Sequence, residues 1–236
     1  MEKGSIFVVA TPIGNLGDIT YRAVETLKEV DFIICEDTRV TNILLDHYGI
    51  SKPLIVSNAK SESKMIERIL EKIEDGKTCA LVTDAGTPCI SDPGVRLVNR
   101  LNAENVSVIS IPGVSAVITA LSISGLPTDS FVFEGFLPQK KGRQKMLKLL
   151  SSEKRTIVLY ESTYRIKKLL EELAGYMPNR QIVVARELTK KFEETWRGTA
   201  SLILQNIDKK TVKGEFVIII SPSNWVEKDL QDHSES

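Results

Sequence analysis

Residues 79–94 form the stretch "CALVTDAGTPCISDPG", which "VRLVNRL" follows directly. The apolar residues 79–82 predict a buried strand, and the apolar spacing after Gly94 predicts a helix. The segment between them, residues 83–94, contains two glycines, two prolines and two aspartates. A connection from a strand to a helix usually needs only about two to six residues. The length and composition of this loop therefore suggest a role beyond joining two elements.

Strand and helix patterns alternate on both sides of this loop, which predicts an α/β fold. Five strand–helix units in the first half indicate a mainly parallel sheet covered on both faces. A segment rich in Gly, Pro and small polar residues, "SGLPTDS" at 124–130, interrupts the pattern, and the second half resumes with the strand patterns "FVFEGF", "RTIVLY", "QIVVARE" and "EFVIIIS". We predict two α/β domains, residues 1–123 and 124–224, followed by a polar tail, 225–236.

Composition limits the class of protein. The chain has 236 residues with 31 basic and 31 acidic side chains, and this balance argues against broad electrostatic wrapping of nucleic acid, although it allows a local basic patch. Its three cysteines are widely spaced and form no CxxC pair, so neither a zinc site nor a disulfide framework is indicated. The N-terminus does not resemble a signal peptide, and no apolar run approaches a membrane span of about 20 residues. A cytoplasmic protein without a metal is expected.

Ligands of open parallel sheets bind beyond the carboxyl ends of the strands. Small, proline-stiffened or charged segments follow the predicted strands at residues 11–18, 36–39, 83–94, 112–116, 160–165 and 185–190. Neither GxGxxG nor GxxxxGK[ST] occurs, which argues against a ligand held by its phosphates. An adenosine-bearing ligand without a phosphate tail fits better, and S-adenosylmethionine is the commonest such cofactor. A carboxylate such as that of Asp84 would suit its sulfonium, amine or ribose hydroxyls.

Six motifs together identify a family resemblance: "VVATPIGNLGDIT", "CEDTR", "LVTDAGTPCISDPG", "IPGVSA", "SGLPTDSFVFEGFLP" and "ARELTKKFEE". In this order they resemble the 16S ribosomal RNA cytidine 2′-O-methyltransferases, a bacterial group within the tetrapyrrole methylase superfamily. The resemblance covers residues 5–221. It implies a two-domain fold with a mixed sheet in the second domain, a donor site between the domains, and a homodimer. The implied substrate is a cytidine ribose in the decoding region of 16S rRNA in the small ribosomal subunit.

The resemblance also implies roles for single residues. By motif, the walls of the S-adenosylmethionine pocket would be Pro12, Asp84, Ala85, Gly86, Thr87, Ile90, Ser115, Ala116, Tyr160 and Ala185. Two motifs depart from the family pattern: the chain has Thr163-Tyr164 within "ESTYR" where ESPHR is common, and Phe192 where a histidine is usual. A histidine general base is therefore not expected.

Methyl transfer to a ribose hydroxyl benefits from a nearby proton acceptor and from groups that orient it. The candidate catalytic residues are Glu36, Arg39, Glu161, Glu187 and Lys190, with Asp37 as a further carboxylate. For each of them a structural ion pair or a solvated turn is the alternative. The basic segment "PQKKGRQKMLK" and the "ESTYR" motif supply the candidate RNA-binding residues Lys140, Lys141, Arg143, Lys145 and Arg165. Trp196 could stack on a base, but a core position is the favoured interpretation.

Two alternatives to an rRNA methyltransferase stay open. The same scaffold could methylate a tetrapyrrole, such as a precorrin or a uroporphyrinogen, although the basic segment and the "DAGTP" and "ELTK" motifs count against it. The chain could also be a donor-binding module without turnover. Fold analogy alone does not separate these functions, because function resides in the site.

Overall fold

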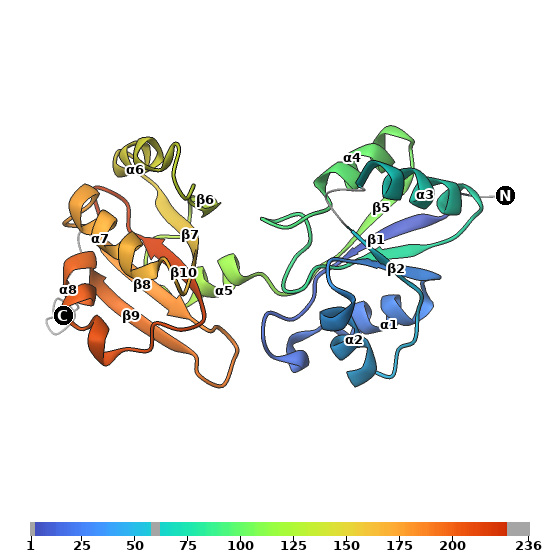
Figure 1. Cartoon of the computed structure of the whole chain (residues 1–236), viewed down its shortest axis with the longest axis horizontal. Helices are drawn as coiled ribbons and strands as arrows, with labels where there is room; N and C mark the ends of the chain where they lie inside the picture. The colour runs from blue at the N-terminus through green and yellow to red at the C-terminus, as the bar shows by residue number, and fades with distance from the viewer. Residues whose placement is uncertain (1–2, 58–61, 226–236) are drawn as a thin grey trace, which may run out of the picture. The chain divides into compact units, whose positions relative to one another are not determined.

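The computed structural model describes residues 3–57 and 62–225. The chain divides into two compact units, Met1–Ala116 and Val117–Ser236 (Figure 1). The sequence places the boundary after residue 123, whereas the division in the structure precedes most of helix α5 (Ala116–Ser122). This helix therefore belongs with the second unit.

The first unit is built on a five-stranded sheet with the order β3-β2-β4-β1-β5. All four strand pairs are parallel, as the alternating pattern predicts. The strands are β1 (Ser5–Val9), β2 (Phe32–Cys35), β3 (Leu54–Val56), β4 (Cys79–Leu81) and β5 (Ser107–Ile111). The helices are α1 (Tyr21–Glu29), α2 (Thr38–His47), α3 (Glu62–Glu74) and α4 (Val95–Ala103), with a short 3₁₀ turn, η1, at Leu16–Asp18.

Two helices cover each face of this sheet, as Figure 1 shows. Successive side chains of a strand point to opposite faces, so each strand supplies both cores. Ile6, Ile34 and Leu81 pack in the core that contains α3 and α4. Ile33 and Ala80 pack in the other core, with α1 and α2. The result is a three-layer α/β/α unit whose inner strands β2 and β4 are buried on both sides.

Helix α2 begins earlier than the sequence pattern indicates. Its apolar spacing becomes visible only at residue 41, but the helix starts at Thr38. Asp37 caps it, because its carboxylate accepts a hydrogen bond from the Arg39 N–H at 2.8 Å. Half of the predicted 36–39 loop is therefore the first turn of a helix.

The second unit contains a mixed sheet with the order β6-β7-β10-β8-β9. Strands β6 and β7 are parallel, and the remaining neighbours are antiparallel. The strands are β6 (Phe131–Phe136), β7 (Thr156–Ser162), β8 (Gln181–Arg186), β9 (Glu194–Thr199) and β10 (Glu215–Ile220). The helices are α5, α6 (Arg143–Ser151), α7 (Ile166–Tyr176) and α8 (Ala200–Gln205), and the 3₁₀ turn η2 spans Ile207–Lys209. Strand β9 was not predicted.

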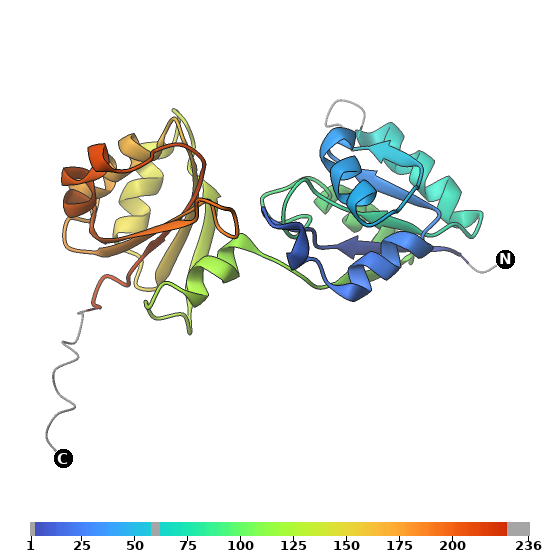
Figure 2. The ribbon, with the colours of Figure 1, turned by 90° about the horizontal axis from the view of Figure 1, so that it is seen from below.

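Helices α6, α7 and α8 pack on one face of this sheet around a single apolar core. Trp196 lies in that core at 2 % exposure, which confirms the core interpretation of this residue over base stacking. The opposite face carries α5 (Figure 2). Arg197 of β9 holds the end of that helix by donating hydrogen bonds to the carbonyls of Ile123 and Ser124. A cation at the C-terminus of a helix is favourable for its dipole.

Two of the three cysteines are free core residues in strands. Cys35 and Cys79 are fully buried, and burial, aided by the charge of Asp31, raises the pKa of Cys79 to about 12. Cys89 is half-buried in the loop after β4. Within the described ranges, no helix is long and apolar enough to cross a membrane.

Candidate active site

The loops that follow β1 and β4 are joined at the carboxyl edge of the first sheet. These strands are neighbours, and β2 lies on the other side of β4. The connections from β2 to β3 and from β4 to β5 run in opposite directions, so the topological switch point of this open sheet lies between β2 and β4. Thr11 and Gly86 form an antiparallel bridge with N···O distances of 2.8 and 3.1 Å. The Thr11 hydroxyl also donates to the Thr83 carbonyl at 3.0 Å. The two loops therefore form one hydrogen-bonded structure.

The 83–94 loop is fixed in a conformation that side chains rarely adopt. Gly86, Cys89 and Ser91 have φ angles of 89°, 71° and 63°. The Thr87 hydroxyl donates to the carbonyl of Val114 at 3.0 Å, which ties this loop to the one after β5. Backbone strain of this kind is found most often at functional sites. The loop is thus a rigid wall at the sheet edge, which explains its length.

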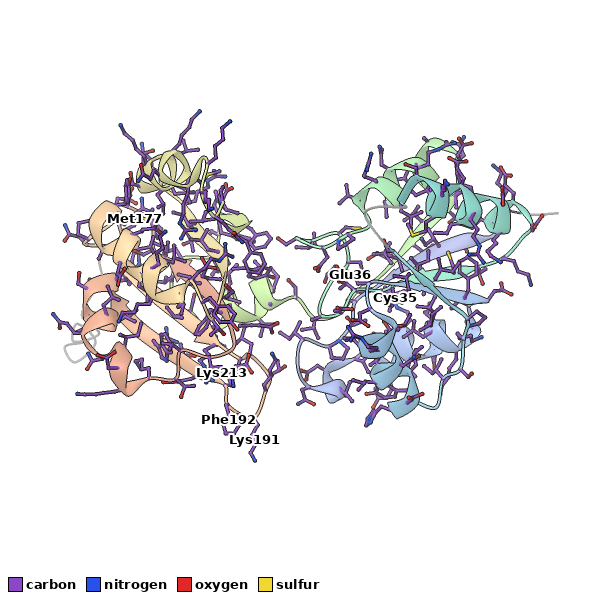
Figure 3. The ribbon with its side chains drawn as sticks, viewed as in Figure 1. Cys35, Glu36, Met177, Lys191, Phe192 and Lys213 are labelled. Atoms are coloured by element: carbon purple, nitrogen blue, oxygen red, sulfur yellow. The ribbon has the colours of Figure 1, made fainter. Side chains whose placement is uncertain are left out.

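Three carboxylates gather beside this wall. Glu36 follows β2 (Figure 3), and its carboxylate accepts a hydrogen bond from the Thr83 hydroxyl at 3.0 Å. The carboxylate of Asp84 accepts from the Asp37 N–H at 3.2 Å. Burial, together with the charges of Glu36 and Asp84, raises the pKa of Asp92 to about 6, and the Thr83 side chain partly offsets this effect. The edge is therefore strongly negative.

The pKa of Asp84 is raised, as that of Asp92 is. Burial raises its pKa, the hydrogen bond from Asp37 lowers it, and the neighbouring charges of Glu36 and Asp37 raise it further, so that the net direction is upward. Perturbed carboxylates beside a strained loop are typical of functional sites. Within the described ranges, no group of three or more His, Cys, Asp or Glu side chains could hold a metal ion.

Asp92 and Thr83 were not among the predicted site residues. The only sequence signal for them was their position inside the long loop. Their importance depends on Glu36, which lies 47 positions before Thr83 in the chain. Sequence spacing does not reveal such a pair.

The predicted pocket walls of the first unit lie on these loops. Ala85 is exposed, and Ile90 has an exposure of 45 %. Ser115 and Ala116 are half-buried where β5 leads toward α5. Pro12, next to the bridging Thr11, is buried. Backbone and small side chains thus form most of the surface of this edge.

Arg39 makes its ion pair with Asp37, and its charge also acts on Asp84 of the carboxylate cluster. Its side chain is 87 % exposed and pairs with Asp37 at 2.5 Å. This pair lowers the pKa of Asp37 to about 2. The geometry matches the alternative of a local ion pair at a helix start.

In the second unit, the carboxyl end of β7 carries an aromatic group and a buried carboxylate. Tyr160 contacts Phe133 and Phe136 with ring centroids 4.9 and 5.6 Å apart. Glu161 is 1 % exposed, and its Oε1 lies 2.8 Å from Nε of Arg165. A carboxylate that is buried and paired in this way is suited to hold its neighbours in place.

Glu187 and Lys190 form a second ionic group, after β8. The Lys190 ammonium lies 3.1 Å from Glu187 and 2.8 Å from Glu215. Burial lowers the pKa of Lys190, but its hydrogen bonds to Glu215 and Glu187 outweigh this effect and raise it overall. Burial likewise raises the pKa of Glu187, while hydrogen bonds from Glu215 and Lys190 lower it overall. Both groups are therefore held in their charged forms.

The same β8 region contains a predicted wall residue and an exposed loop. Ala185 is fully buried in β8, opposite Val217 of β10. Lys191 and Phe192 extend from the loop between β8 and β9 (Figure 3), and Phe192 is 67 % exposed. Glu187 and Thr189 in this loop have positive φ angles of 50° and 65°.

The candidate RNA-binding residues separate into two groups. Lys140, Lys141 and Lys145 are exposed. Arg143 is 4 % exposed and is bound to the Glu172 carboxylate by its Nε and Nη2 at 2.6 to 3.0 Å. Because this guanidinium is buried and paired, its expected role as an RNA contact is corrected to a structural one.

Arg165 is also largely occupied by protein contacts. Its side chain is 22 % exposed, pairs with Glu161 and lies over the ring of Phe136 at 5.8 Å. These contacts hold the guanidinium against the end of β7, which does not favour the expected RNA contact.

Comparisons with known proteins agree with this architecture. The sequence profile of the tetrapyrrole (corrin/porphyrin) methylases matches residues 5–203. Among solved structures, a cobalt precorrin-4 methyltransferase has a TM-score of 0.69 and 20 % identity, covering 92 % of this chain and 94 % of its own. Uroporphyrin-III C-methyltransferase from Thermus thermophilus, complexed with S-adenosylhomocysteine, has a TM-score of 0.65 and 17 % identity, covering 93 % of this chain and 98 % of its own. At these identities the likeness establishes the fold alone.

Sequence relatives are much closer. Ribosomal RNA small subunit methyltransferase I of Thermotoga maritima is 44 % identical over 92 % of this chain and 98 % of its own length. The proteins of that name from Synechocystis and Escherichia coli O157:H7 are 46 % and 44 % identical over 99 % and 97 % of this chain, and 86 % and 82 % of their own lengths. The chain therefore belongs to the tetrapyrrole methylases and, within them, to the ribosomal RNA small subunit methyltransferase I family.

Proposed function

We propose that this protein transfers the methyl group of S-adenosylmethionine to the 2′-hydroxyl of a cytidine in the decoding region of 16S rRNA, within the small ribosomal subunit. One observation carries the proposal: the chain is 44–48 % identical over most of its length to proteins named ribosomal RNA small subunit methyltransferase I. The cytidine ribose comes from the motif resemblance described above.

The edge of the first sheet fits the proposed donor. S-adenosylmethionine carries a sulfonium and an ammonium group but no phosphate. A cluster of Glu36, Asp84 and Asp92, in which burial and mutual repulsion raise the pKa of both aspartates, favours a cationic ligand and disfavours an anionic one. Ala85 and Pro112, which have small side chains, are exposed at this edge and allow close approach of a ligand.

The residues proposed to hold the donor are those of the predicted pocket. In the first unit these are Pro12, Asp84, Ala85, Gly86, Thr87, Ile90, Ser115 and Ala116, and in the second unit Tyr160 and Ala185. When bound, the donor supplies an electrophilic methyl group. The protein has to hold the acceptor hydroxyl in line and exclude water from it.

Glu36 is the best candidate for the proton acceptor. Among the five candidate catalytic residues, it is the carboxylate that is neither fully buried nor paired with a cation in the described part of the chain. Lys190 and Glu187 neutralise each other, and Glu161 is buried against Arg165. We assign these three, with Arg39, to positioning or structure. Glu36 would take the proton of the ribose hydroxyl as the oxygen attacks.

The alternative functions make different predictions. The tetrapyrrole methyltransferases compared above among solved structures are 17–20 % identical to this chain, and at such identities they support the fold and not the substrate. A donor-binding module without turnover would bind S-adenosylmethionine and label nothing. Neither is favoured by a specific observation.

Radioactive methyl transfer tests the proposal. Small ribosomal subunits from cells lacking this gene are incubated with the protein and tritiated S-adenosylmethionine, beside naked rRNA and a uroporphyrinogen. We expect label in the subunits and protection of a single cytidine linkage from alkaline cleavage, because a 2′-O-methyl group removes the attacking hydroxyl. Label in the uroporphyrinogen alone, or donor binding without label in any acceptor, would overturn the proposal.

A cytoplasmic homodimer completes the proposed function. The homodimer comes from the family resemblance and the cytoplasmic location from the sequence analysis, and the ribosomal substrate is consistent with both. Sedimentation equilibrium measures the assembly directly: one chain has a mass of 26.3 kDa, so a dimer has twice that mass. A monomer at micromolar concentration would contradict the dimer without affecting the proposed reaction.

A further inference from the structure

The second unit contains a pocket where the basic segment 138–148 meets α7. It lies between the start of α6 and the exposed side of α7, and its volume is about 340 Å³. The lining residues are Gln139, Lys140, Gly142, Arg143, Gln144, Lys145, Lys168 and Glu172. Helices α6 and α7 are neighbours in both ribbon views (Figures 1 and 2).

The side chains that line the pocket carry more positive than negative charge. Glu172 is its single carboxylate, and Arg143 already neutralises it by a bidentate ion pair. Lys140, Lys145 and Lys168 are exposed, and within the described ranges none of them forms an ion pair or a side-chain hydrogen bond. Three unpaired ammonium groups around one concave site create a positive potential that an anion would complement.

Arg143 has a defined role in this arrangement. Its Nη1 donates to the Pro138 carbonyl at 3.2 Å, and its Nη2 lies 3.8 Å from the buried Glu161 carboxylate. The guanidinium thereby joins the segment before α6 to α7 and to the end of β7. The pocket floor is rigid, so the lysines surround a preformed depression.

We propose that this pocket binds a backbone phosphate of the RNA substrate, with Lys140, Lys145 and Lys168 as its ligands. The inference rests on the proposed function, and it adds Lys168 to the predicted RNA contacts while it removes Arg143. Lysine ammonium groups bind phosphates as point charges. The N-terminus of α6 contributes in the same direction, because Gly142 and Gln144 line the pocket and the helix dipole is positive there.

Salt-dependent binding of a small-subunit rRNA fragment tests the pocket. The full chain is compared with a triple variant, Lys140→Gln, Lys145→Gln and Lys168→Gln. Because the three lysines bind one phosphate, their loss should lower the slope of log K against log [salt] by about 0.7 and weaken binding about tenfold. Lys154→Gln, an exposed lysine with no described side-chain contact, is the matched control and should leave both values unchanged.

The outcomes separate the pocket from the reaction. Donor binding by calorimetry should be equal in the triple variant and the wild type, which shows that the variant is folded. If the wild type methylates subunits but the triple variant binds RNA with the same slope, the pocket inference is wrong and the proposed function stands. If the wild type methylates no RNA, the proposed function fails.

Inorganic phosphate distinguishes the source of the anion. We expect it to compete with the RNA fragment for the wild type and to have less effect on the triple variant. If phosphate binds the wild type through these lysines but RNA affinity does not depend on them, the pocket is a site for a free anion and the RNA assignment is overturned.

Discussion

At the scale of single residues, Glu36 differs from the other candidate carboxylates because it has no cationic partner in the described part of the chain. Its partner is the Thr83 hydroxyl at 3.0 Å, which the carbonyl oxygen of a glutamine side chain could also engage. Glu36→Gln should therefore keep the local structure and lose the proton acceptor, and we expect kcat to fall by about 10² to 10⁴. Single-turnover methyl transfer measures this. Glu25→Gln, on the exposed side of α1, is the control, and an unchanged kcat for Glu36→Gln would exclude this residue as the base.

For Glu161 we expect substitution to reduce stability and not to remove the general base, because its carboxylate is buried. Removing one partner of a buried ion pair costs about 3–5 kcal/mol, since the other charges lose their compensation. Glu161→Gln leaves Arg165 and Arg143 without this carboxylate. We expect a marked loss of thermal stability but the wild-type shape of the pH–rate profile. A profile that loses its acid limb would instead make Glu161 the general base.

Asp92 should make stability depend on pH. Its pKa is about 6 in the folded protein, against 3.8 for the unperturbed group, so the native state binds more protons between these values. The free energy of unfolding therefore falls as pH rises from 4 to 6. After allowance for solvent screening, Asp92→Asn should gain about 1–2 kcal/mol relative to the wild type between pH 4 and pH 7. Urea denaturation at both pH values measures this gain, and Asp129→Asn gives the baseline for an exposed aspartate. Equal differences at both pH values would contradict it.

Arg143 shows where residue-level prediction fails. The run "PQKKGRQKMLK" predicts an exposed basic helix, and for its lysines the exposure is as expected. Arg143 is instead buried, where it pairs with Glu172 of α7. Glu172 lies 29 residues later in the chain, so the segment itself does not reveal this pair. The composition of a segment indicates its charge, but the pairing of each charge depends on tertiary structure.

At the scale of elements, the inner parallel strands β2 and β4 of the first unit were predictable because both faces of each are buried. Such strands appear as continuous apolar runs such as "FIIC". Strand β9, "ETWRGT", was missed, since one buried tryptophan among polar residues gives a weak pattern. Its position at the sheet edge, with β8 as its single neighbour, explains this composition.

The loop between β8 and β9 depends on a glycine outside it. A Cβ on Gly214, whose φ is 121°, would lie 2.6 Å from Oε1 of Glu187. We expect Gly214→Ala to destabilise the protein by about 1–3 kcal/mol and to displace the Glu187–Lys190 pair. Gly175→Ala is the matched control: it lies in α7 with no atom within 4 Å of its Cβ and should stabilise by about 0.5–1 kcal/mol. Thermal unfolding measures the stability of both variants. Equal shifts in Tm for the two would show that the close contact between position 214 and Glu187 is absent.

At the scale of the whole molecule, the net charge is balanced although the two units carry net charges of opposite sign. Residues 1–116 contain 12 basic and 16 acidic side chains, whereas residues 117–236 contain 19 and 15. The acidic unit carries the carboxylates proposed to face a cationic donor, and the basic unit carries the lysine pocket proposed for RNA. Total charge alone could not indicate this arrangement, because the two halves cancel.

Each unit has its own apolar core, so the two can unfold separately. The residues proposed to bind the donor belong to both units, and unfolding of either would release it. We therefore expect calorimetry to show two transitions without donor and a stabilisation of both by S-adenosylmethionine, about 2.7 kcal/mol at 100 times its Kd. Gly214→Ala assigns the transition of the second unit, since it should lower that one in the absence of donor. If the donor raises only the other transition, Tyr160 and Ala185 do not contribute to its binding, and the donor site must be sought on the first sheet alone.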